Sequence, residues 1–365
     1  VVRYIYETLD KSTSYTFRLA GSSVADLAGN VSAKPVELTF TTAATDPVPA
    51  PKIESKNHLW YNRPAKYWEE ALPLGNGRLG VMHSGGIACD TLQLNEDTFW
   101  DEGPNENYNA NAKSVLKQVQ NGIFAKDYAS VQDLAVRNWM SQGSHGASYR
   151  AAGELLLSFP GQRFDDEEPG QTSDAVDAEG YVRYLDMNTA TSNVQYNVSG
   201  VDYKRTVFTS FDDNVTIVRL EASEAGKLNF NVAYTGCNKT NIEKLLTNKL
   251  YDDHTIKATM GPARSQNEGV DNKLNLCTYI RIIDCDGAIT NGKTNIYGQG
   301  TAGPATNAPQ LIVSGASHAT IVISQATNFK KYNDVSGDAS ATALSYLTSY
   351  EAKGKDYATT LADHE

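Results

Sequence analysis

The sequence has few of the residues that build a metal site or a disulfide framework. It contains 4 cysteines and 6 histidines among 365 residues. No CxxC pair and no His or Cys spacing typical of zinc ligands occurs, so we expect free thiols and neither a metal nor another cofactor. Cys277 and Cys285 lie in the run LCTYIRIIDC, which is typical of one strand. Strand residues rise about 3.3 Å each, which separates these two by roughly 26 Å, so we predict that they are not bonded to each other.

Long apolar runs and blocks of basic residues are also missing. No stretch approaches the about 18 consecutive apolar residues of a membrane span, and no signal-peptide pattern occurs. Lys and Arg number 32 against 43 Asp and Glu, a formal net charge of −11. Nucleic acids and anionic membranes attract basic surfaces, so we expect neither as a partner. A neutral ligand such as a glycan is compatible with this charge.

Short alternating apolar runs are abundant. Hydrophobic residues make up 40% of the chain, which is enough for a large core. From about Leu59 to Phe329, alternating runs follow one another with turn residues between them. Val194–Val198 and Tyr203–Val207, on either side of Ser199-Gly200, are typical of a hairpin. The pattern predicts a mainly β fold, a large antiparallel β-supersandwich.

One stretch interrupts the strands with helical periodicity. Apolar residues recur at i, i+3, i+4 and i+7 from Ala112, and at i, i+3, i+6 and i+7 from Tyr128. The spacing predicts an inserted pair of amphipathic helices, near 111–121 and 125–139, joined by a turn at Asn121-Gly122. Their apolar sides are expected to face a sheet. A further helix is expected from Ala339 to Lys353.

Residues 1–44 resemble the C-terminal part of a bacterial Ig-like domain. The resemblance is carried by Tyr15-Thr16-Phe17, then Asp26–Asn30 as a turn, then Phe40-Thr41-Thr42. It implies a partial Ig-like β-sandwich and, because such modules occur in exported proteins, a secreted or cell-surface bacterial location. Prolines between Thr45 and Pro51 then indicate an extended linker, assigned to 45–57.

The densest motif is WEEALPLGNGRLG, followed by LQLNEDTFW. Gly75-Asn76-Gly77 is typical of a turn, and the spacing of a phosphate-binding loop is absent. A glycosidase needs two carboxyl groups about 5–9.5 Å apart. Glu69, Glu70, Glu96 and Asp97 could supply such a pair, or they could be ordinary surface carboxylates. Asp165–Glu168 is interpreted as a solvated loop.

Four segments together resemble the start of glycoside hydrolase family 95: LWYNRPAKYWEEALPLGNGRLGVMHSGG, LQLNEDTFWDEGP, YRAAGEL and ISQATNF. The resemblance implies a parent exo-glycosidase that inverts configuration, an α-L-fucosidase acting on terminal α-1,2-fucose of glycans or a related α-L-galactosidase. It also implies a β-supersandwich over 58–330, the start of a helical linker over 331–365, and an (α/α)6 barrel that carries the catalytic acid and base. Those catalytic positions lie outside this sequence, so we expect the chain alone to be inactive.

The loop that follows the LQL run supplies the candidate site. We expect four of its residues to contact the helical barrel or to shape the edge of its pocket: Asn95, Glu96, Thr98 and Trp100. Stacking on a sugar and packing in a core or domain interface both remain open for the four tryptophans, Trp60, Trp68, Trp100 and Trp139. Two other functions compete with the fucosidase assignment, an autonomous carbohydrate-binding module and a scaffold without a ligand.

Overall fold

The computed structural model of the chain describes residues 10–21, 30–31, 34–41, 48–53, 56–101, 103–104, 108–140, 148–164, 174–236, 246–262, 272–296 and 305–365. The chain divides into two compact units, Val1–Pro49 and Ala50–Glu365. The first holds an antiparallel pair, β1 (Ser14–Leu19) and β2 (Val36–Thr41), in unbroken register. The turn expected at Asp26–Asn30 lies, apart from Asn30, outside the described residues.

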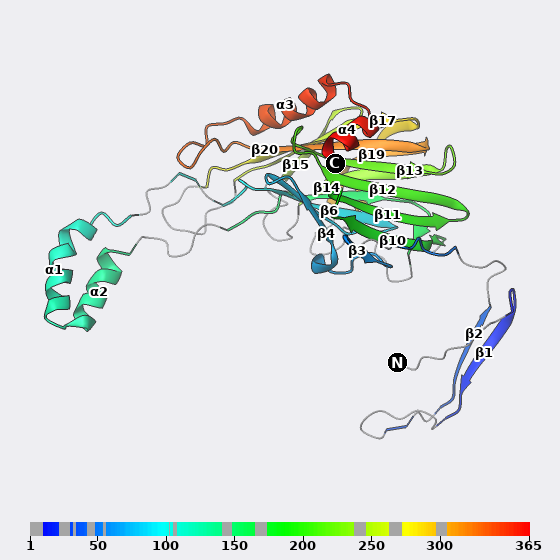
Figure 1. Cartoon of the computed structure of the whole chain (residues 1–365), viewed down its shortest axis with the longest axis horizontal. Helices are drawn as coiled ribbons and strands as arrows, with labels where there is room; N and C mark the ends of the chain where they lie inside the picture. Colours follow the sequence, from blue (N-terminus) through cyan, green and yellow to red (C-terminus); the bar gives the residue numbers. More distant parts are fainter. Residues whose placement is uncertain are drawn as a thin grey trace. The chain divides into compact units, whose positions relative to one another are not determined.

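Two antiparallel sheets make up most of the second unit (Figure 1). In spatial order, one contains β15 (Leu246–Asp252), β16 (Thr255–Met260), β17 (Leu276–Cys285), β20 (His318–Thr327), β13 (Val215–Ala222), β12 (Val201–Thr209), β11 (Thr191–Val198), β10 (Glu179–Asp186) and β3 (His58–Tyr61). The other contains β18 (Ala288–Ile296), β19 (Ala305–Ala316), β14 (Leu228–Thr235), β7 (Glu154–Ser158), β6 (Cys89–Glu96), β5 (Leu79–His83) and β4 (Leu72–Gly75). A short parallel pair, β8 (Gln162–Arg163) and β9 (Val176–Asp177), lies outside them. The mainly β, sandwich-like fold expected from the sequence is confirmed.

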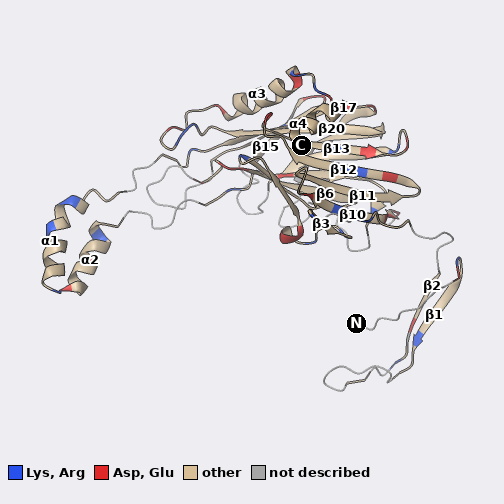
Figure 2. Cartoon of the chain, in the orientation of Figure 1, with Lys and Arg blue, Asp and Glu red and all other residues tan. Residues whose placement is uncertain are grey.

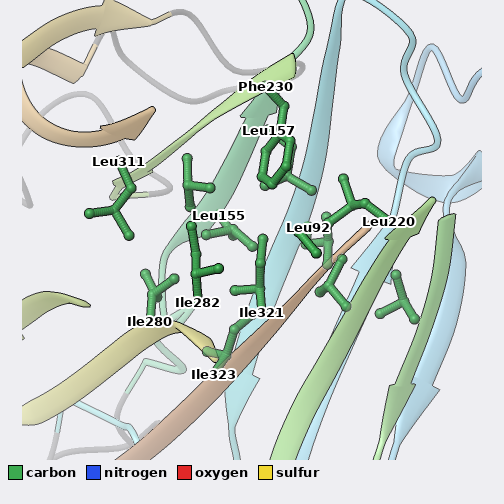
Figure 3. Close-up of a cluster of buried hydrophobic side chains, with 14 of the residues drawn as sticks. Leu92, Leu155, Leu157, Leu220, Phe230, Ile280, Ile282, Leu311, Ile321 and Ile323 are labelled. Atoms are coloured by element: carbon green, nitrogen blue, oxygen red, sulfur yellow. The ribbon is translucent and has the colours of Figure 1, made fainter. Parts of the chain in front are cut away.

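The main core lies between the two sheets. Leu92 and Leu155 from the seven-stranded sheet share one buried cluster with Ile280 and Ile321 from the nine-stranded sheet (Figure 3). Because strand side chains alternate, every second residue of β6 and β7 points into this cluster, and the residues between them point to the outer face. That alternation decides which side chains of β6 and β7 can reach a ligand.

The β11–β12 hairpin turns at Ser199-Gly200, as the sequence predicts. Both residues have positive φ, 54° and 87°, which is the backbone of the tight turns that match the twist of paired strands. Glycine adopts such φ values without steric cost, which explains its place here.

The inserted helical pair is present as α1 (Ala112–Phe124) and α2 (Tyr128–Asn138). Two details differ from the expectation. The turn lies at 125–127 instead of Asn121-Gly122, and the helices pack against each other instead of against a sheet. Gly122 lies inside α1, where a Cβ would sit 2.1 Å from a methyl of Val131. The glycine therefore permits close approach of the helices and does not end one.

The helix expected after Gly337 is present as α3 (Ala339–Ala352), followed by α4 (Tyr357–His364). Asp338 caps α3 by accepting from the Ala341 backbone N–H. Ala343, Leu347 and Tyr350 of α3 pack with Phe208 and Val322 in a second buried cluster. α3 thus covers part of the nine-stranded sheet, on the side opposite the main core (Figure 1).

The cysteine expectation is confirmed for the described residues. Cys277 and Cys285 lie at the two ends of β17, and both are free, as is Cys89. Cys237 lies outside the described residues.

Charged residues of both signs are interspersed along the described chain (Figure 2). None of the described helices is long and apolar enough to cross a membrane.

Candidate functional site

The Gly75-Asn76-Gly77 turn places an arginine beneath the segment Asn95–Trp100, which we call the candidate loop. Asn76 Oδ1 accepts from the backbone N–H groups of Arg78 and Leu79, at 3.0 and 2.8 Å, which closes the turn between β4 and β5. Arg78 Nη1 then donates to Glu96 Oε1 and to the Gln325 carbonyl, each at 3.1 Å. Its guanidinium also lies 4.6 Å from the centre of the Tyr346 ring of α3. Arg78 therefore ties the candidate loop to β20 and to α3.

Glu96 is buried and holds the loop from the inside. Its Oε2 accepts from the Thr98 backbone N–H at 3.0 Å and from the Thr98 hydroxyl at 2.6 Å. Burial raises the pKa of Glu96, and the bonds from Thr98 and the charge of Arg78 offset only part of that effect. With both oxygens occupied inside the protein, Glu96 supports the loop.

Trp100 lies at the end of the loop with 39% of its surface exposed, whereas Phe99 is completely buried. Trp100 Nε1 donates to the Asp97 carbonyl at 2.8 Å, and its ring meets Tyr149 edge-on with centroids 5.7 Å apart. The Arg150 guanidinium lies 4.4 Å from the centre of the Phe99 ring and pairs with Asp101 at 3.1 Å. The loop is therefore held on both sides of Trp100.

A cavity of about 550 Å³ opens beside this loop, a size within the range of small-molecule pockets. Its lining includes Asp97, Thr98, Trp100, Phe329, Tyr332 and Val335. Thr98 Oγ1 lies 2.5 Å from Thr327 Oγ1, which joins the loop to the end of β20. Trp100, Phe329 and Tyr332 all remain exposed, so aromatic surface from two separate segments meets at one opening.

The structure separates the four sequence-predicted residues into two pairs. Thr98 and Trp100 line the cavity. Asn95 instead accepts from the Tyr149 hydroxyl at 2.6 Å, and Glu96 lies beneath the loop. Arg78, which the sequence indicates only as part of a turn motif, bonds to Glu96 and joins it to β20 and α3. Its position in an Asx turn was the available signal, but the residues that it contacts are distant in sequence: Glu96, Asn214, Gln325 and Tyr346.

The other carboxylates considered from the sequence have local structural contacts or are exposed. Glu70, in a short 3-10 helix η1 (Trp68–Glu70), accepts from the Lys66 backbone N–H and pairs with Arg63, each at 2.8 Å. The Lys66 hydrogen bond is the largest of the effects that lower the pKa of Glu70. Glu69 and Asp97 each line a cavity. Asp165–Glu168 lies outside the described residues. Among the residues that the structure describes, no group of three His, Cys, Asp or Glu could hold a metal ion.

None of the four tryptophans lies in the core. Trp60, Trp68, Trp100 and Trp139 are each more than a third exposed. Trp139 Nε1 donates to the Ala112 carbonyl at 2.8 Å and so joins the ends of the helical pair. Packing in the sandwich core is thereby excluded for all four, and interface packing and ligand stacking stay open.

Residues 59–332 match the family model described as "Glycosyl hydrolase family 65, N-terminal domain". The match takes in both sheets and the candidate loop and covers well over half of the chain. The chain belongs to this family, whose description names family 65, whereas the sequence motifs resemble family 95. The matched residues are therefore a glycoside hydrolase N-terminal domain, and the mainly β fold is consistent with this.

Curated relatives of this N-terminal domain are named as fucosidases. The chain is 34% identical over 176 residues to "Alpha-L-fucosidase 2" of Arabidopsis thaliana, which covers 48% of the chain and 19% of that protein. It is 28% identical over 177 residues to "Probable alpha-fucosidase A" of Aspergillus niger, covering 46% and 20%. A second "Probable alpha-fucosidase A", of Aspergillus oryzae, is 27% identical over 186 residues, covering 47% and 22%. The chain thus spans about a fifth of the length of the curated relatives it matches.

Proposed function

We propose that this chain is the non-catalytic N-terminal part of a secreted, inverting α-L-fucosidase of family 95 that removes terminal α-1,2-fucose from glycans. The observation that carries the proposal is the 34% identity to a relative named as an α-L-fucosidase, of which the match covers 19%. The remaining length of such a relative leaves room for a catalytic barrel outside the matched segment. The alternative within family 95 is that the parent enzyme is an α-L-galactosidase.

For Glu70 and Glu96, the structure favours a structural role over a catalytic one. Glu96 is buried and bonded to Arg78 and Thr98, and Glu70 is bonded to Arg63 and a backbone N–H. An acid that donates a proton to a glycosidic oxygen must reach the substrate. These two carboxylates are instead occupied by contacts that stabilise the domain.

The cavity beside the candidate loop is the proposed contact surface for the barrel. Exposed aromatic groups are costly in water, and each large ring buries on the order of 150–250 Å² when it packs. Trp100, Phe329 and Tyr332 meet at this cavity, next to the segment that leads into α3. We place the barrel against this surface, with Trp100 at the edge of the substrate pocket.

The proposal that the protein is secreted by, or displayed on, a bacterium is based on the N-terminal unit. Its β1–β2 pair has the antiparallel register expected of strands from an Ig-like sandwich, and Tyr15 stacks on Phe40 with centroids 6.0 Å apart. The domain assignments are part of the same proposal: 1–44 to the C-terminal part of an Ig-like domain, 45–57 to a linker, 58–330 to the supersandwich and 331–365 to the start of a helical linker.

We expect the purified chain to release no fucose from 2′-fucosyllactose or from an aryl α-L-fucoside, and the complete reading frame to release it. The physical reason is that hydrolysis needs a general acid and a base on opposite sides of one glycosidic bond, and we propose that both lie on the catalytic barrel. Product analysis by chromatography checks both statements. Fucose release by the chain alone would place the catalytic groups within it, and an inactive or galactoside-specific complete protein would reject the fucosidase assignment.

In the complete enzyme, Trp100→Ala is expected to lower kcat/KM on 2′-fucosyllactose about tenfold, which corresponds to about 1.4 kcal/mol of transition-state stabilisation. The reason is that Trp100 shapes the cavity edge through its own ring and through Thr98 and Asp97. Trp60→Ala is the matched control, because Trp60 is also exposed but lies on β3, away from this cavity. Equal kcat/KM values for the two variants would mean that Trp100 does not contribute to the substrate pocket.

A further inference from the structure

A second cavity, of about 480 Å³, lies on the outer face of the seven-stranded sheet. Its floor is formed by Met82 on β5, Gln93 on β6 and Glu154 on β7, which are neighbours in the sheet register. Leu92 and Leu155, adjacent to these residues in sequence, point into the main core. By strand alternation, Gln93 and Glu154 therefore face away from the core and toward the cavity.

Glu154 is the feature of this cavity that the fold does not explain. Only 1% of its surface is exposed. Oε1 accepts from the Gln93 side-chain amide at 3.1 Å, whereas Oε2 is buried and has no hydrogen-bond partner. Leaving a buried carboxyl oxygen unpaired costs free energy, and a bound molecule that supplies the missing hydrogen bond would remove this cost.

The wall of the cavity supplies aromatic surface. The segment Ala65–Ala71 runs along it, and Tyr67 and Trp68, both of which line the cavity, are 63% and 58% exposed. Ser84 and Thr91 add hydroxyl-bearing side chains to the lining. The cavity thus combines aromatic rings with a carboxyl, an amide and hydroxyls, and its volume is in the range of small-molecule pockets.

These groups are the ones that recognise a neutral sugar. The C–H face of a pyranose packs on an aromatic ring, and its hydroxyls donate to carboxylates and exchange hydrogen bonds with amides and hydroxyls. We propose that this cavity is a binding subsite for one neutral sugar unit, in which Trp68 packs against the ring and Glu154 Oε2 accepts from a hydroxyl. The subsite is distinct from the cavity beside Trp100, which shares no lining residue with it.

The sugar class follows from the cavity, and only the choice of L-fucose as the first probe rests on the proposed function. The chain is titrated with L-fucose, D-galactose and D-glucose and followed by tryptophan fluorescence and by saturation-transfer NMR. We expect at least one of these sugars to bind at millimolar concentration. Trp68→Ala and Glu154→Gln are each expected to weaken that binding about tenfold, or about 1.4 kcal/mol. Trp60→Ala, which removes an exposed tryptophan outside the cavity, is expected to leave it unchanged.

The outcomes separate the subsite from the fucosidase assignment. Binding of galactose or glucose, but not fucose, with loss in both cavity variants supports the subsite and argues against fucose as its ligand. Absence of binding for all three sugars in the folded chain overturns the subsite, and so does equal binding by Trp68→Ala and Trp60→Ala. Circular dichroism and melting curves verify that each variant is folded, and fucose release by the complete enzyme is measured independently.

Discussion

Asp90→Ala is expected to lower the free energy of unfolding by about 3–5 kcal/mol. Asp90 on β6 is fully buried and pairs with Arg205 on β12 at 2.5 Å and with His83 at 2.8 Å, so that it joins the two sheets. Its other oxygen accepts from the backbone N–H groups of Gly85 and Gly86. Burial alone would raise the pKa of Asp90, but His83 and Arg205 hold it well below its usual range. Removing the carboxylate leaves the Arg205 guanidinium buried without its counter-charge.

Urea unfolding followed by tryptophan fluorescence measures this loss. Asp177→Ala is the matched control, because Asp177 pairs with Arg163 at 2.6 Å but is 61% exposed. Exposed pairs contribute about 0–1 kcal/mol, so the two variants should differ by several-fold. In a double-mutant cycle, the variant with both Asp90→Leu and Arg205→Met should lose less unfolding free energy than the two single variants lose in sum. The reason is that the double variant leaves no buried charge unpaired. Similar losses for Asp90→Ala and Asp177→Ala would mean that the buried pair contributes no more than a surface pair.

The strands were predictable because alternation is a local property of the sequence. The β11–β12 hairpin follows from two alternating runs and from the residues at Ser199-Gly200. The same alternation assigns Leu92 and Leu94 to the core, where both are buried. The free thiols of Cys277 and Cys285 follow from the length of one strand. The two inserted helices could also be predicted from local spacing. The role of Gly122 could not, because it depends on Val131 of the other helix.

The site residues were less predictable, because their roles depend on partners far away in the chain. Thr98 and Trp100 could be chosen for their position after a strand, but their cavity is completed by Phe329 and Tyr332. Asp90 and Arg205 are separated by 115 residues, and nothing local indicates that they meet. Glu154 lies in an ordinary alternating strand, and its burial depends on how the Ala65–Ala71 segment covers the sheet. Sequence alternation predicts the face of such a residue but not what covers it.

Glu154→Gln is expected to change the pH dependence of stability between pH 4.5 and neutral pH. Burial raises the pKa of Glu154 from its ordinary value of 4.5 to about 7, and the hydrogen bond from Gln93 offsets part of the effect. The folded protein therefore holds a proton on this group that the unfolded chain releases between pH 4.5 and 7. The contribution of Glu154 to the free energy of unfolding is therefore fully present at low pH. It falls by about 3 kcal/mol in total as the pH rises through about 7.

Glutamine has nearly the same shape and cannot ionise, so the variant should escape this loss. Relative to the wild-type chain, Glu154→Gln should gain about 3 kcal/mol of unfolding free energy between pH 4.5 and pH 8, with almost all of the gain complete by pH 8. Urea titrations at several pH values measure the difference between the two proteins, in which the other titrating groups cancel. Glu69→Gln serves as the control, because Glu69 lines the same cavity but is exposed. A difference between wild type and Glu154→Gln that stays constant across this pH range would mean that Glu154 is solvated or paired in solution. The unpaired Oε2 would then no longer support a ligand site.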